Sequence, residues 1–108
     1  MPSHNKLVRD YIPEVIKKTN KEFATRILSE KEYKVELKKK LSEELTEYNE
    51  AKTNEEAVEE LADILELLHT AIKLHGSSFE ELEKVRQAKD EKRGGFEKRI
   101  FLIEVEDD

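Results

Sequence analysis

The chain has 108 residues, of which 43% are charged and 36% hydrophobic, and its formal net charge is -6 at pH 7. This length predicts one domain over residues 1–108, close to the size at which a partner chain helps to bury surface. The acidic balance argues against a nucleic-acid or anionic-membrane partner, because either would need a basic face. With no cysteine, no signal-like start and no membrane-length apolar run, we expect a cytoplasmic protein without disulfides or thiolate metal sites.

Two helices are predicted in the first half of the chain. Asp10 can cap a short helix that runs to about residue 20, with Pro13 tolerated near its N-terminus. Ser29 and Glu32 then have the spacing of a capping box and begin a helix over residues 30 to about 51. This second helix carries an apolar stripe at helical spacing, formed by Tyr33, Leu37, Leu41, Leu45 and Tyr48.

Two further helices follow a short break at residues 53–54. Thr53 with Glu56 repeats the capping-box spacing, and the third helix should end at His75, just before Gly76. Ser77 with Glu80 offers the start of a fourth helix, which we expect to end near Lys92. The β-tolerant segments 24–28 and 100–105 are expected to pair as a short two-stranded element.

The third helix has two apolar faces side by side. One face comprises Leu61, Leu65, Leu68 and Ile72, and the other comprises Ile64, Leu67, Ala71 and Leu74. A single helical hairpin cannot cover both faces, so a second subunit is expected to supply the rest of the bundle. The sequence therefore predicts an all-α helical bundle completed by formation of a homodimer or tetramer.

Two acidic pairs flank the break between the second and third helices. Glu44 and Glu47 precede it, Glu60 and Asp63 follow it, and in an antiparallel hairpin residue 44 would lie level with 63, and 47 with 60. Either pair alone is commonplace in a chain with 26 acidic residues. Four carboxylates in one small volume, however, repel one another and call for divalent cations. All-oxygen ligation favours Mg²⁺, or Mn²⁺, over zinc.

Basic residues form a second set of candidates. Lys89 and Arg93 share a face of the fourth helix just before two glycines, where they are predicted to clamp phosphate oxygens. The alternative is an ordinary mixed-charge surface helix with a glycine stop. Lys6 and Arg9, near the start of the chain, form a weaker candidate of the same kind.

The acidic motifs resemble those of a known superfamily. Residues 43–47 (EELTE), followed after twelve residues by residues 60–63 (ELAD), are similar to the EExxE and ExxD signature of the all-α nucleoside triphosphate pyrophosphatases, the MazG and phosphoribosyl-ATP pyrophosphohydrolase-like superfamily. Residues 5–14 (NKLVRDYIPE) and 89–96 (KDEKRGGF) resemble its small branch of house-cleaning enzymes for noncanonical nucleotides.

This resemblance implies Mg²⁺-dependent hydrolysis of a nucleoside triphosphate between its α and β phosphates, giving the monophosphate and pyrophosphate. It implies that Glu44, Glu47, Glu60 and Asp63 bind the metal and that Glu43 supports the site. Glu44 or Glu47 would help to deprotonate the attacking water while Lys89 and Arg93 hold the departing phosphates. Two alternatives remain open, a non-catalytic helical interaction module and a nucleotide or metal sensor without turnover.

Overall fold

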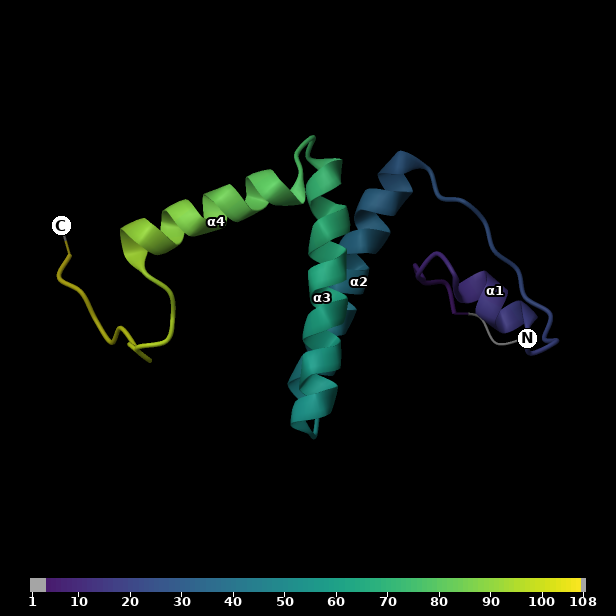
Figure 1. Cartoon of the computed structure of the whole chain (residues 1–108), viewed down its shortest axis with the longest axis horizontal. Helices are drawn as coiled ribbons and strands as arrows, with labels where there is room; N and C mark the ends of the chain where they lie inside the picture. Colours follow the sequence, from purple (N-terminus) through teal and green to yellow (C-terminus); the bar gives the residue numbers. More distant parts are fainter. Residues whose placement is uncertain (1–3, 108) are drawn as a thin grey trace.

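A computed structural model describes residues 4–107, and over this range the chain forms four α-helices and no strand. The helices are α1 (Ile12–Lys17), α2 (Glu30–Glu50), α3 (Asn54–Leu74) and α4 (Phe79–Arg93). Helices α2 and α3 fold back on each other as a hairpin, with α1 and α4 on opposite sides of it (Figure 1). The prediction of an all-α fold is confirmed.

The two helices of the hairpin begin where the capping residues predict. The hydroxyl of Ser29 accepts a hydrogen bond from the backbone N–H of Glu32 at 3.2 Å, and the Glu32 carboxylate accepts one from the backbone N–H of Ser29 at 3.1 Å. The Thr53 hydroxyl likewise accepts from the backbone N–H of Glu56 at 3.1 Å. These bonds satisfy N–H groups that the first turn of each helix leaves free, and they fix the starts of α2 and α3.

Two predicted helix starts are wrong. Helix α4 is capped by Ser78, whose hydroxyl accepts from the backbone N–H of Glu81 at 3.2 Å, and not by Ser77. The backbone N–H of Ser77 is already used, because it donates to the carbonyl of Ile72 at 3.3 Å in the turn that ends α3. Helix α1 begins after Tyr11 without a side-chain cap, so Asp10 does not cap it.

The predicted two-stranded β element is also wrong for the described residues. Segments 24–28 and 100–105 have no regular secondary structure, and they lie at opposite ends of the molecule (Figure 1). The physical reason is that α4 carries the C-terminal segment away from the N-terminal arm, so neither segment has a strand beside it. Most of their apolar side chains are left in solvent, with Ile27 96% and Ile103 85% exposed.

The small core lies where α2 packs against α3. Leu37 is only 4% exposed, and the apolar face formed by Ile64, Leu67, Ala71 and Leu74 is half-buried. Most of the other face of α3 is open, since Leu61, Leu65 and Leu68 are 46%, 47% and 36% exposed. One hairpin thus covers one of the two predicted faces. Among the described helices, none is both long and apolar enough to cross a membrane.

Candidate metal centre

Three carboxylates meet between the two helices of the hairpin. Glu44 and Glu47 extend from α2 and Glu60 from α3, and one carboxylate oxygen of each lies within 4.8 Å of the others. The spacing of three residues places the first two on one face of α2. Glu60 joins them because it lies on the apolar face of α3 that packs against α2. The sequence prediction that these three acids converge therefore agrees with the structure.

Two oxygens of this cluster are buried without a hydrogen-bond partner, Glu44 Oε2 and Glu60 Oε2. Glu44 as a whole is only 6% exposed. Burying a carboxylate without a partner is costly, and an ion bound between the helices would supply the missing contacts. The cluster has the donor set that a hard divalent cation requires, carboxylate oxygens from facing helices.

Burial and repulsion within the cluster favour a protonated state. Burial raises the pKa of Glu44 to about 7, and contacts with Glu60 and Glu47 and the negative charge of Asp63 add to the effect. For Glu60, the contact with Glu44 acts to lower its pKa, but burial and the carboxylates of Glu47 and Asp63 outweigh it and the pKa is raised. Burial and the neighbouring carboxylates thus raise the pKa of both Glu44 and Glu60.

Lys40 is a neighbour of the cluster that the sequence analysis missed. Its Nζ lies 3.6 Å from Glu44 Oε1 and 3.4 Å from Glu43 Oε2, and its side chain is only 19% exposed. Lys40 thus balances part of the negative charge and connects Glu43 to the cluster. The only sequence signal is its position three and four residues before these acids, a spacing that is common on helix surfaces.

Asp63 lies beside the cluster and is paired with the N-terminal arm. The Arg9 guanidinium donates a hydrogen bond through Nη2 to Asp63 Oδ1 at 2.6 Å. Asp63 is nevertheless close enough for its charge to raise the pKa of Glu44 and of Glu60. The structure thus brings three of the four predicted ligands together, and holds the fourth next to them in an ion pair.

Lys6 also lies near this end of the site. It lines a hollow of about 190 Å³ between the arm and α2, together with Asn5, Leu7, Glu36, Lys39, Lys40 and Glu43. This hollow shares Lys40 and Glu43 with the surroundings of the carboxylate cluster. The predicted cations Lys6 and Arg9 are therefore placed on the same side of the hairpin as the acids.

The cations predicted on α4 are not brought to the carboxylates of their own chain. Lys89 and Arg93 are exposed, and α4 projects away from the α2–α3 hairpin (Figure 1). The neighbouring Arg86 is engaged within α4, where its Nε donates to Glu83 Oε1 at 2.9 Å. Gly94 ends the helix in the left-handed region at φ 79°, a conformation that favours glycine.

Comparison of the chain with family models, curated proteins and solved structures found no match in any of the three.

Proposed function

We propose that the protein is a Mg²⁺-dependent nucleoside triphosphate pyrophosphohydrolase that acts on noncanonical nucleotides. The observation that supports this most is the convergence of Glu44, Glu47 and Glu60, with two buried oxygens that lack partners. The motif resemblance described above points to the same chemistry. The reaction adds water at the α phosphorus, breaks the bond to the oxygen that bridges the α and β phosphates, and releases pyrophosphate.

The donor set fits a hard cation. Glu44, Glu47 and Glu60 would hold Mg²⁺ or Mn²⁺, and Asp63 would join them if Arg9 releases it. When bound, the ion supplies charge neutralisation for phosphate oxygens and lowers the pKa of a bound water. Phosphoryl transfer depends mainly on such charge stabilisation and on alignment, so a site with few other groups is sufficient.

The chain's own residues have distinct roles in this proposal. Glu44 or Glu47 accepts the proton that the attacking water loses, as a carboxylate placed within reach of that water can. Lys40 keeps Glu43 and Glu44 in place through its two ion pairs. Arg9 and Lys6 bind phosphate oxygens from the arm, and Arg9 exchanges its contact with Asp63 for one with the substrate.

The proposal includes a homodimer formed through the open face of α3. Leu61, Leu65 and Leu68 form an apolar stripe that the hairpin leaves exposed, and pairing two such stripes would build a four-helix core. Leu65→Glu should shift the protein from dimer to monomer in sedimentation or light scattering. Lys73→Glu, also exposed on α3, is the control and should leave the dimer intact. A wild-type monomer would refute this part of the proposal.

In the proposed dimer, Lys89 and Arg93 of one chain would act at the carboxylate cluster of the partner chain. Chains carrying Glu60→Gln and chains carrying Arg93→Gln should each have low activity. Mixed dimers would regain activity, because one of their two sites then has intact carboxylates and an intact arginine. Recovery on mixing supports sharing between chains, and an additive mixture without recovery contradicts it.

The direct test of the proposed activity is pyrophosphate release from a panel of normal and modified nucleoside triphosphates, with Mg²⁺ or Mn²⁺. Glu60→Gln should lower kcat/KM by at least roughly 100-fold, since metal stabilisation of the transition state is worth several kcal/mol. Glu59→Gln is the matched control, because Glu59 precedes Glu60 on α3 but is exposed. Folded wild-type protein that releases no pyrophosphate under any condition would refute the enzyme and favour a metal or nucleotide sensor.

A further inference from the structure

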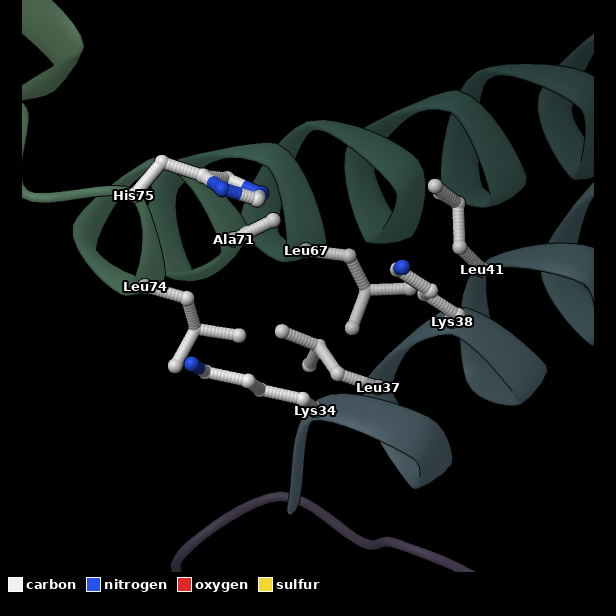
Figure 2. A pocket seen from close by; sticks show the side chains of 8 residues that line it. All are labelled: Lys34, Leu37, Lys38, Leu41, Leu67, Ala71, Leu74 and His75. Carbon is white, nitrogen blue, oxygen red and sulfur yellow. The ribbon is translucent and has the colours of Figure 1, made fainter. Parts of the chain in front are cut away.

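An apolar hollow lies between α2 and α3 at the end of the hairpin away from the Ala51–Thr53 turn. Its volume is about 90 Å³, and its apolar lining consists of Leu37, Leu41, Leu67, Ala71 and Leu74. Figure 2 shows these side chains turned toward one another from the two helices. A leucine-lined hollow that remains open within the chain offers apolar area to an incoming side chain.

The rim of this hollow is basic. Lys34 and Lys38 extend from α2 toward α3, and His75 stands at the end of α3 (Figure 2). Lys34 has only a loose ion pair, 3.8 Å from Nζ to Glu30 Oε1, and Lys38 has no ion pair within residues 4–107. The hollow therefore suits a segment that combines apolar side chains with carboxylates.

The C-terminal segment, residues 100–107, has this combination. Its apolar side chains Ile100, Phe101, Leu102, Ile103 and Val105 are 82%, 88%, 73%, 85% and 73% exposed, and Glu104, Glu106 and Asp107 accompany them. In an extended chain, alternate residues face opposite sides. Phe101, Ile103 and Val105 would thus face the leucines, and Glu104, Glu106 and Asp107 would place negative charge beside the basic rim.

Charge separates this segment from the other exposed apolar segment, residues 21–28. That segment has two cations, Lys21 and Arg26, against one acid, Glu22, so it offers the basic rim less negative charge than residues 100–107. Helix α4 holds the C-terminal segment of the same chain away from the hairpin (Figure 1). A second copy can present the segment without that constraint.

We propose that residues 100–107 of one copy dock in the apolar hollow between α2 and α3 of a second copy. The exchange is reciprocal, so each dimer contains two docked segments. The proposal does not depend on catalytic activity or on the carboxylate cluster, and its contacts differ from those of the open α3 face.

Engineered disulfides test the docking directly, because the chain of 108 residues has no cysteine. Ala71→Cys places a thiol in the hollow, and Ile103→Cys places one in the segment. Chains that carry one variant each are mixed and oxidised, and the products are separated by mass with the help of a short tag on one chain. The mixed disulfide should form at least about tenfold faster than with the control Glu22→Cys, because docking raises the effective thiol concentration.

Equal rates for Ile103→Cys and Glu22→Cys, with circular dichroism confirming that the variants are folded, would overturn the proposal. A double variant carrying both cysteines that oxidises only within single chains would also overturn it, because the chain's own segment would then fill the hollow.

A charge exchange tests the role of the rim. The double change Lys34→Glu with Lys38→Glu should slow formation of the mixed disulfide by about tenfold. The change removes two ion pairs with the docked segment and adds repulsion between carboxylates. Glu104→Lys with Glu106→Lys on the partner chain should restore the rate. If Glu104→Lys with Glu106→Lys does not restore the rate of disulfide formation, the basic rim does not recognise the segment by its charge.

Discussion

The α2–α3 hairpin and the segments on either side of it differ in how much of their apolar surface the chain itself covers. The two side chains that are buried among the described residues, Leu37 and Glu44, both lie on α2 where it faces α3. In α1 and α4 no side chain is buried, and Phe96 is 99% exposed. One chain thus specifies the hairpin, whereas the flanking segments carry apolar surface suited to a partner.

The same division applies to charge. The hairpin carries the carboxylate cluster, and the flanking segments carry the four cations predicted to bind phosphate. The arm already reaches the hairpin through the ion pair of Arg9 with Asp63, while α4 does not approach the cluster in one chain. The carboxylate cluster thus forms within a single hairpin, whereas the proposed phosphate site would also need the flanking segments.

The largest effect on stability should come from the hairpin core. Leu37→Ala removes a side chain that is 4% exposed, and we expect it to lower the free energy of unfolding by about 2–5 kcal/mol. Val35→Ala, at a site that is 48% exposed on the same helix, should cost less than about 1 kcal/mol. Urea unfolding of both variants measures the difference, and equal losses would contradict the assignment of the core to this interface.

Acid titration should give an intermediate effect in the metal-free protein. The pKa of Glu44 is about 7 in the folded state, against an ordinary value of 4.5. Below pH 4.5 the group is protonated in both states and costs nothing. As the pH rises to about 7, the unfolded chain releases the proton first, so this group lowers stability, and the loss is complete above that pH.

Thermal unfolding between pH 5 and 8 measures this loss as the difference between variants. Glu44→Gln cannot ionise, so its Tm relative to wild type should rise with pH, by about 5 °C over the range. Glu59→Gln should keep the wild-type pH dependence, because Glu59 is exposed. A difference in Tm between wild type and Glu44→Gln that does not change with pH would contradict the raised pKa of Glu44.

The smallest effect on stability should come from the contact between arm and hairpin. Arg9 and Asp63 are 57% and 38% exposed, so Arg9→Gln should cost only about 0.2–1 kcal/mol. The variant should bind Mg²⁺ more tightly, because Asp63 loses its competing partner, yet bind nucleotide more weakly. Arg86→Gln, which removes an ion pair within α4, is the control. Weaker Mg²⁺ binding by Arg9→Gln would argue against competition for Asp63.

Local spacing was enough to predict most of the hairpin. Capping residues fixed the starts of α2 and α3, and the positions of Glu44, Glu47 and Glu60 on their helices predicted the cluster. The start of α4 was misassigned because Ser77 and Ser78 each have a glutamate three residues later, so spacing alone cannot choose between them. The choice depends on how α3 ends.

Features that depend on contacts between distant parts of the chain could not be predicted from the sequence. The ion pair between Arg9 and Asp63 joins residues that are 54 positions apart, and no local sequence pattern predicts it. The two β-tolerant segments were paired incorrectly because their separation depends on the direction in which α4 leaves α3. Lys40 was missed because its position on α2 looks like an ordinary surface ion pair until the burial of Glu44 is known.

Thermal unfolding in a Mg²⁺ titration shows whether the carboxylate cluster binds a divalent cation. A ligand that binds the folded state stabilises it by about 2.7 kcal/mol at a hundred times its Kd. The Tm of wild type and of Glu59→Gln should therefore rise steadily with Mg²⁺ concentration, while that of Glu60→Gln stays constant. A rise of the same size in Glu60→Gln, or no rise in wild type, would contradict metal binding at the cluster.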